Sequence, residues 1–116
     1  DVISFHCKAP KDGKPIITKE HYKKMKPTSY IVNAARGNIV DENDLNDALN
    51  ENIISGAAID VFSNEPAKEN VLFNNSKVIL TPHIAASTKE ASIVVAEMIA
   101  NQISDYLLNG QKINTV

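Results

Sequence analysis

The 116-residue sequence has no tryptophan, one cysteine and four glycines. The single cysteine, Cys7, excludes an internal disulfide and a cysteine-based metal cluster, and this usage fits a reducing, cytoplasmic setting. Because Cys7 lies in an apolar, strand-like run, we expect a packed and inert thiol. The glycines, at positions 13, 37, 56 and 110, do not form a G-x-G-x-x-G phosphate loop. A dinucleotide would therefore need a pyrophosphate site that lies mostly outside this chain.

Other classes of site also lack their characteristic residues. No apolar run approaches the roughly 20 residues that a membrane-spanning helix needs, and no G-x-S-x-G of a serine hydrolase is present. The three histidines, at positions 6, 21 and 83, are far apart in sequence, so no metal site is expected. The net charge is −2, with 12 basic and 14 acidic residues. We expect no nucleic-acid or membrane partner, and predict a small-molecule or protein partner instead.

Apolar runs alternate with segments of helical spacing. We expect strands at 1–7, 29–34, 54–62 and 78–81, and helices at 19–25, 41–52 and 88–108. Thr18 and Asp41 are predicted N-caps, Pro27 ends the first helix, and Gly110 follows the last. Residues 63–77 are expected to be irregular, and 112–116 to form a short strand or a tail. The order βαβαβ-loop-βα, with strands that are apolar on both faces, predicts an α/β fold with a parallel sheet covered on both sides.

Four candidate site residues follow the expected strands: Arg36, Asp60, Glu65 and His83. Arg36 is the only arginine, whereas the other eleven basic residues are lysines; a guanidinium offers a planar fork that can bind a carboxylate through two hydrogen bonds. In parallel sheets, ligands bind at the carboxyl ends of the strands. The alternatives are a solvated cation for Arg36, an exposed loop carboxylate for Glu65 and a turn histidine for His83. An unpaired Asp60 would be costly at the end of an apolar strand.

These residue types suit one chemistry together. An arginine that binds a carboxylate and a histidine that transfers a proton are the groups needed to interconvert a 2-oxo acid and a 2-hydroxy acid. A glutamate beside the histidine would hold its ring and favour the protonated form. Such a site also needs a separate hydride carrier.

Three segments carry a family resemblance: "MKPTSYIVNAARGNIVDENDLNDAL" (25–49), "ISGAAIDVFSNEP" (54–66) and "VILTPHIAASTKEA" (78–91). In this order and spacing the chain resembles the C-terminal half of the D-isomer-specific 2-hydroxyacid dehydrogenases, and within them most closely the D-3-phosphoglycerate dehydrogenases. The resemblance implies a Rossmann-like, parallel-sheet layer. Residues 1–116 would form the second half of an NAD-binding domain, with the helix and tail 88–116 leading back toward an absent substrate domain.

The resemblance also implies roles for individual residues. Arg36 would bind the substrate carboxylate and carbonyl, His83 would be the general acid/base, and Glu65 would pair with it. The expected NAD contacts are His6, Ala34, Ala35, Arg36, Asp60, His83, Ile84, Ala85 and Ala86. The family has H-x-P at the position of His6, whereas "HCKAP" has its proline four positions after the histidine.

The implied activity is hydride transfer between NAD(H) and a small D-2-hydroxy acid, with 3-phosphoglycerate of serine biosynthesis as the favoured substrate and a homodimer as the parent enzyme. A glyoxylate/hydroxypyruvate reductase, a non-catalytic NAD-sensing corepressor-like module, and a structural half-domain that dimerises through the last helix are alternatives. Because the family's substrate domain and glycine-rich loop are absent, we expect a fragment that is inactive alone. A sheet cut at this point would expose an apolar face and a strand edge.

Overall fold

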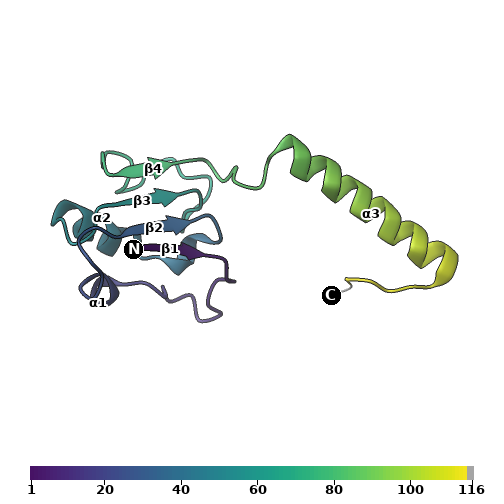
Figure 1. Cartoon of the computed structure of the whole chain (residues 1–116), viewed down its shortest axis with the longest axis horizontal. Coiled ribbons are helices and arrows are strands. Elements are labelled where there is room, and N and C mark those ends of the chain that lie inside the picture. Colours follow the sequence, from purple (N-terminus) through teal and green to yellow (C-terminus); the bar gives the residue numbers. More distant parts are fainter. Residues whose placement is uncertain (115–116) are drawn as a thin grey trace. The chain divides into compact units, whose positions relative to one another are not determined.

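The computed structural model describes residues 1–114. Four strands form one sheet in the order β1-β2-β3-β4: β1 (Val2–Phe5), β2 (Tyr30–Asn33), β3 (Gly56–Ile59) and β4 (Val78–Leu80). All three pairings are parallel, so the carboxyl ends of all four strands lie at one edge of the sheet (Figure 1). The predicted α/β fold with a parallel sheet is confirmed.

The second and third predicted helices begin and end close to the predicted residues, and a short 3₁₀ helix that was not predicted precedes the second. The helices are α1 (Lys19–Tyr22), the 3₁₀ helix η1 (Gly37–Ile39), α2 (Glu42–Asn50) and α3 (Lys89–Asn109). Asp41 caps α2, because its side chain accepts hydrogen bonds from the backbone N–H groups of Asn43 and Asp44, both at 3.0 Å. Both predicted ends of the long helix are confirmed: Thr88 accepts from the N–H of Ala91, and Gly110 adopts a left-handed conformation with φ 66°.

The first helix is shorter than the predicted range of 19–25. The α-helix ends at Tyr22. The hydrogen bonds that follow span three residues instead of four, from Lys24 N–H to the His21 carbonyl and from Met25 N–H to the Tyr22 carbonyl. Such i to i+3 bonds are the usual way in which a helix tightens at its end. The sequence pattern therefore located the helix but overestimated its length.

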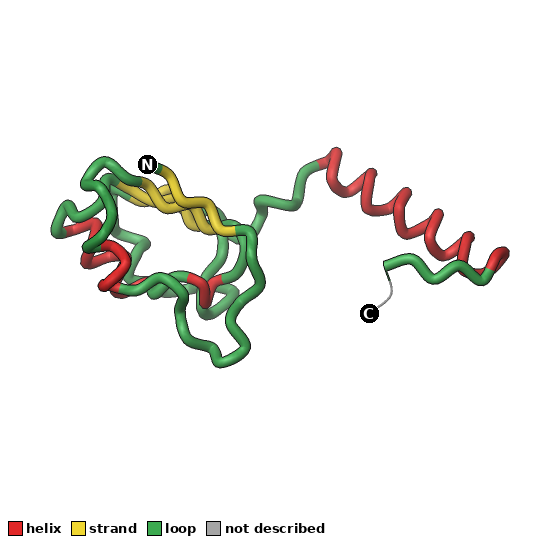
Figure 2. Tube along the Cα trace, turned by 60° about the horizontal axis from the view of Figure 1, so that its bottom comes forward, coloured by secondary structure: helices red, strands yellow, loops and turns green. Residues whose placement is uncertain are grey.

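The core of the first unit lies on one face of the sheet. Ile31 and Ile59 project from the strands and pack with Leu45 and Leu49 of α2 and with Tyr22 of α1, all at most 3% exposed. Figure 2 shows the two helices on the same side of the sheet. Burial of this apolar surface is the main stabilising contribution to the unit.

Within residues 1–83, no helix covers the opposite face of the sheet. Val2, Tyr30 and Ile79, which share this face by the strand register, are 62%, 49% and 72% exposed. Residues 1–83 by themselves therefore cover the sheet on one face only, and the predicted covering of the second face is not found within this unit. The exposed apolar face and the edge strand expected of a partial domain are both present.

The chain divides into two compact units, residues 1–83 and 84–116. The second unit contains α3, whose apolar side chains, including Ile99 and Ile103, are about half exposed.

No described helix is both long and apolar enough to cross a bilayer. Residues 111–114 form no strand, and residues 115 and 116 of the predicted final strand lie outside the described residues. The assignment of 1–116 to one partial domain stays a prediction.

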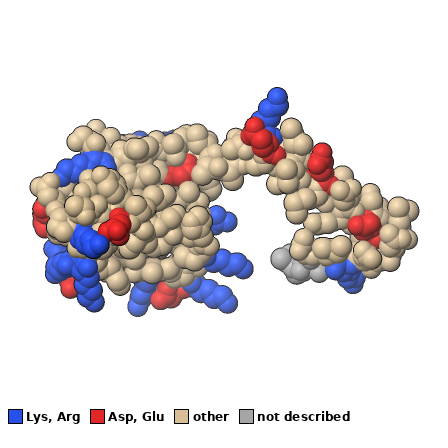
Figure 3. Space-filling view, in the orientation of Figure 1, with Lys and Arg blue, Asp and Glu red and all other residues tan. Residues whose placement is uncertain are grey.

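The basic and acidic residues are nearly equal in number, but they are not evenly distributed along the chain. Lysines gather in α1 and the segments on either side of it, at positions 8, 11, 14, 19, 23, 24 and 26, where the acidic residues are Asp12 and Glu20. Figure 3 shows basic side chains along one side of the first unit and acidic side chains along α3. Lys23 pairs with Glu20, and Lys26 with Asp1, both in exposed ion pairs that contribute little to stability.

Candidate active site

Arg36 lies in a turn that Asn33 holds. Asn33, the last residue of β2, is 1% exposed, and its side chain donates to the Arg36 carbonyl (2.9 Å) and accepts from the N–H of Ala35 (3.2 Å). A buried amide needs such partners, and here they fix the backbone that leaves the strand. The exposed Arg36 side chain donates from Nη1 to the Ala35 carbonyl at 2.6 Å. The arginine is therefore presented by a backbone turn with fixed hydrogen bonds.

Glycine is required immediately after Arg36 because another backbone segment lies against it. A Cβ atom on Gly37 would be 1.9 Å from the Phe62 carbonyl oxygen and 2.5 Å from the Ser63 nitrogen. No side chain fits in that space, and the obstacle is backbone that cannot rotate away. The "RG" pair thus brings the arginine segment into direct contact with the loop after β3.

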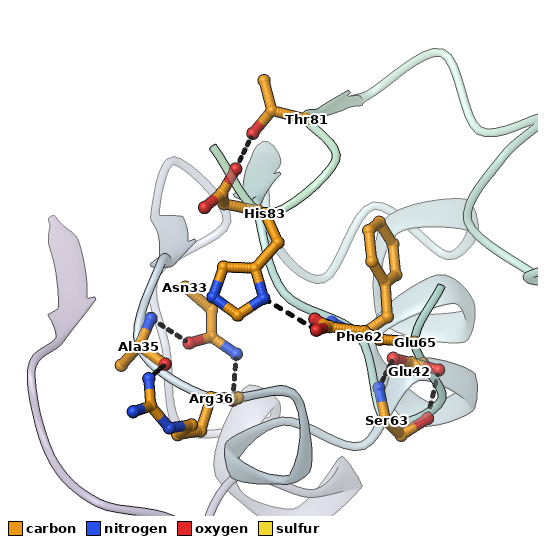
Figure 4. Close-up of polar contacts among 10 residues, drawn as sticks. Asn33, Ala35, Arg36, Glu42, Phe62, Ser63, Glu65, Thr81 and His83 are labelled. Atoms are coloured by element: carbon orange, nitrogen blue, oxygen red, sulfur yellow. Dashed lines mark hydrogen bonds and ion pairs between the residues drawn. The ribbon is translucent and has the colours of Figure 1, made fainter. Parts of the chain in front are cut away.

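Glu65 lies in that loop and binds two groups with its two oxygens. The backbone N–H of Phe62 donates to Oε1 at 2.8 Å, and Oε2 lies 2.7 Å from Nδ1 of His83 (Figure 4). The hydrogen bond from Phe62, followed by that from His83, lowers the pKa of Glu65 below its ordinary value. Glu65 is consequently a carboxylate at neutral pH and can orient the imidazole ring.

His83 is held by its backbone as well as by its ring. Its N–H donates to the carbonyl of Asp60 at 2.8 Å, and its φ of 56° is in the left-handed region. The Asp60 side chain is 6% exposed and accepts a hydrogen bond from the hydroxyl of Thr81. The carboxyl ends of β3 and β4 are thereby joined just before the histidine. The ring nitrogen Nε2 points away from Glu65 (Figure 4).

The three predicted catalytic residues line one hollow. Arg36, Glu65 and His83 border a space of about 270 Å³ together with Gly37 and Phe62. Three segments that are far apart in sequence, after β2, β3 and β4, therefore deliver a cation, a carboxylate and an imidazole to one place. This is the arrangement that a site at the carboxyl ends of parallel strands requires.

A second hollow, of about 320 Å³, brings together four of the predicted cofactor contacts. His6, Ala34, Ala35 and Arg36 line it, and Lys8 lies at the same place. The two small alanine side chains leave room for a planar or extended group, so these residues fit one side of a dinucleotide site. His6 lies within hydrogen-bonding distance of the Ser4 hydroxyl, at 2.9 Å.

Cys7 lines the same hollow and is exposed, so the prediction of a packed thiol is wrong. The physical reason is that β1 ends at Phe5, two residues earlier than the apolar run suggests, and Cys7 lies in the loop that follows. Ile84, Ala85 and Ala86 belong to the second unit, and their predicted contacts with the cofactor stay predictions.

Sequence reasoning missed the side chains that hold the site together. Asn33 supports the arginine turn, Thr81 bonds to Asp60, and Glu42 of α2 binds Ser63 in the loop that carries Glu65. A lone polar residue in an apolar strand was a signal for Asn33. Nothing local marks Glu42, because its partner lies 21 residues away.

Comparison with known proteins shows the family to which the chain belongs. The family model described as "D-isomer specific 2-hydroxyacid dehydrogenase, NAD binding domain" matches residues 1–85. The D-3-phosphoglycerate dehydrogenase of Synechocystis sp. is 46% identical over 108 residues, which are 93% of this chain and 20% of that protein. The chain thus spans about a fifth of the length of this relative.

Two solved structures share the fold. A glyoxylate reductase from Paecilomyes thermophila superposes with a TM-score of 0.86 at 32% identity, covering 97% of this chain and 34% of the other. A D-lactate dehydrogenase from Lactobacillus jensenii, solved with NAD⁺, gives 0.83 at 29% identity, covering 100% and 39%. The cofactor expected from the sequence, NAD, agrees with the family description and with this neighbour. The chain belongs to the D-isomer specific 2-hydroxyacid dehydrogenase family, of which it carries part of the NAD-binding domain.

Proposed function

We propose that this chain is the catalytic half of a cofactor domain in a dehydrogenase that transfers a hydride between NAD(H) and C2 of a small D-2-hydroxy or 2-oxo acid. The observation that carries the proposal is the contact between His83 Nδ1 and Glu65 Oε2, 2.7 Å long, beside the hollow that Arg36 also lines. An imidazole paired with a carboxylate and set beside a guanidinium suits proton transfer on a substrate that carries a carboxylate.

Each group has one role in this proposal. Arg36 binds the substrate carboxylate and carbonyl, since a guanidinium has five N–H donors and the Ala35 carbonyl takes one. Glu65 holds Nδ1 of His83, which leaves Nε2 as the atom that exchanges a proton with the substrate oxygen. In reduction, Nε2 gives its proton to the forming hydroxyl, and Glu65 stabilises the imidazolium beforehand. Bound NAD(H) supplies the hydride, and His6, Ala34 and Ala35 line the hollow that would hold part of it.

We favour 3-phosphoglycerate and 3-phosphohydroxypyruvate as the substrate pair. The support is the 46% identity to a protein named D-3-phosphoglycerate dehydrogenase. Glyoxylate is the second candidate, supported by the fold of the glyoxylate reductase, which matches at a TM-score of 0.86. The groups that would bind the distal phosphate are expected in a substrate domain, and the homodimer expected for the parent is part of the same proposal.

The test is an assay of the intact protein that carries this chain. NADH oxidation is followed with 3-phosphohydroxypyruvate, hydroxypyruvate and glyoxylate, each over a range of concentrations. We expect the highest kcat/KM with 3-phosphohydroxypyruvate. A higher value with glyoxylate would replace the favoured substrate but keep the reaction class, whereas no NADH consumption with any 2-oxo acid would refute the proposed activity.

A second measurement asks whether the 116-residue chain binds NADH and turns over substrate by itself. In an NADH fluorescence titration followed by addition of 3-phosphohydroxypyruvate, we expect weak binding and no measurable turnover. The reason is that the two hollows hold only some of the groups that a cofactor and a substrate need, since the pyrophosphate site and the substrate domain are expected outside this chain. Saturable binding with NADH consumption would show that this chain assembles a working site by itself.

A further inference from the structure

Glu42, the first residue of α2, binds the loop that carries the proposed catalytic glutamate. Its Oε1 accepts from the backbone N–H of Ser63 at 2.8 Å, and its Oε2 accepts from the Ser63 hydroxyl at 2.9 Å and from Nδ2 of Asn70 at 2.8 Å. Figure 4 shows the two bonds to Ser63 beside the His83–Glu65 pair. Three donors from two points of the loop thus converge on one carboxylate.

These bonds are not needed to begin the helix. Asp41 already caps α2 by accepting from two backbone N–H groups of its first turn. The carboxylate of Glu42 instead reaches residues 21 and 28 positions further along the chain. Asn70 is itself fixed, because its Oδ1 accepts from the N–H of Leu72 at 3.0 Å. A charged acceptor makes stronger hydrogen bonds than a neutral one, so this contact is a firm anchor for the loop.

The anchored residue is adjacent to the groups that orient Glu65. Phe62, whose N–H donates to Glu65 Oε1, directly precedes Ser63, and the carbonyl of Phe62 lies against Gly37. The peptide between Phe62 and Ser63 is therefore fixed by Gly37 on one side and by Glu42 on the other. Since Gly37 and Glu42 both belong to the segment that follows Arg36, this segment also sets the position of the loop that delivers Glu65.

We propose that Glu42 is a positioning residue of the active site. By holding Ser63, it fixes the turn 62–65 from which Glu65 reaches His83. It also fixes the position of this turn relative to the segment that carries Arg36. The inference deepens the proposed function and rests on it for the role of His83. Glu42 acts through Glu65, and it does not itself line either of the two hollows described above.

NMR on the 116-residue chain tests this without cofactor or substrate. The ¹³C resonance of the Glu65 carboxyl and the amide proton of Phe62 are followed through an acid titration in the wild type and in Glu42→Ala, Glu42→Gln and Glu69→Ala. Glu69→Ala is the matched control, because it removes the same charge from an exposed position of the same loop. His83 and Asp60, which act on the charge of Glu65, and Arg36, which lines the same hollow, are unchanged in every variant.

In the wild type, the Phe62 amide proton should shift as Glu65 titrates, since the two groups share a hydrogen bond. In Glu42→Ala, we expect that shift to be largely lost and the pKa of Glu65 to rise toward its ordinary value. Glu42→Gln should restore most of the wild-type behaviour, because the amide oxygen can still accept from Ser63 N–H. Glu69→Ala should behave as the wild type.

An unchanged Phe62 shift and an unchanged Glu65 titration in a folded Glu42→Ala chain would overturn the inference. If Glu42→Ala does not fold, Glu42→Asp answers the same question, because it keeps the charge at the start of α2 and shortens its reach. Unaltered Phe62 and Glu65 titrations in Glu42→Asp would then overturn the inference. The proposed dehydrogenase activity fails independently, in the NADH assay of the intact protein.

Discussion

Gly37 and Phe62 are in direct backbone contact, although 24 residues separate them and each follows a different strand. A Cβ atom at position 37 would lie 2.0 Å from the Phe62 carbonyl carbon. This contact sets the spacing between the segment that carries Arg36 and the loop that carries Glu65. It also explains why glycine, and not another small residue, follows the arginine.

Gly37→Ala should destabilise the first unit, because the added methyl group meets backbone and the two segments must separate. Overpacking of this kind costs about 1–3 kcal/mol. Urea unfolding followed by circular dichroism measures the loss. Asn38→Ala, at the exposed neighbouring position, is the control and should unfold close to the wild-type midpoint. A wild-type midpoint for Gly37→Ala would show that the loop after β3 moves freely.

Tyr22→Phe should leave stability unchanged or increase it by about 1 kcal/mol. The Tyr22 ring is fully buried, and within the described residues its hydroxyl has no hydrogen-bond partner. Burial, with Asp44 and Asp41 nearby, raises the pKa of this phenol, so it is neutral at all ordinary pH values. The measurement is the thermal unfolding midpoint of Tyr22→Phe. The control is Tyr30→Phe, which should unfold like the wild type because Tyr30 is half exposed. A clear loss of stability would mean that the Tyr22 hydroxyl is satisfied, for example by a buried water.

Asp41→Ala should destabilise the first unit by about 0.5–2 kcal/mol, since it leaves the N–H groups of Asn43 and Asp44 without their acceptor. Asp47→Ala removes the same charge from an exposed position inside α2 and should have a much smaller effect. Chemical denaturation of both variants under one condition separates loss of the cap from loss of a charge.

Glu65 should make the free energy of unfolding of the first unit decrease at acidic pH. Its pKa is lowered by the hydrogen bonds from Phe62 and His83, so the folded state favours the carboxylate. That contribution is fully present above the ordinary glutamate value of 4.5 and declines as the pH falls below it, through the lowered folded-state pKa. In Glu65→Gln this part of the pH dependence should vanish, whereas Glu69→Gln should retain it. Unfolding midpoints at neutral pH and below pH 4.5 give the comparison.

Arg36→Lys in the intact protein should lower kcat/KM for the 2-oxo acid by roughly 10- to 100-fold, because an ammonium keeps the charge but not the two-pronged geometry. Lys11→Arg, a basic-residue exchange at an exposed loop position that lines neither hollow, should have little effect. Steady-state NADH oxidation measures both. Near-normal turnover by Arg36→Lys would refute the role assigned to this arginine.

Much of the fold and part of the site followed from local patterns. The alternation of apolar runs and helical segments located all four strands, and Asp41 and Gly110 were recognisable as caps. Arg36, Asp60 and His83 were candidates because each follows a strand of a parallel sheet. These features depend on neighbours in sequence, which is why a single sequence reveals them.

Other features depend on which distant segments meet. The bond from Ser63 to Glu42 and the approach of Phe62 to Gly37 join segments that no periodicity connects. The exposure of Cys7 depends on where β1 stops pairing with β2, and the bare face of the sheet depends on the absence of a second covering layer within residues 1–83. The resemblance to a known family identified catalytic residues, but not the side chains that support them.

The backbone of His83 affects how substitutions at this position should be read. At φ 56°, most residues lose backbone stability whatever their side chain does, whereas asparagine and glycine tolerate the conformation. A valine or alanine variant would therefore combine the loss of the imidazole with a displaced strand end, and could exaggerate the importance of the ring. Asparagine, which keeps a polar side chain and suits the left-handed backbone, is the substitution that isolates the chemistry of the histidine.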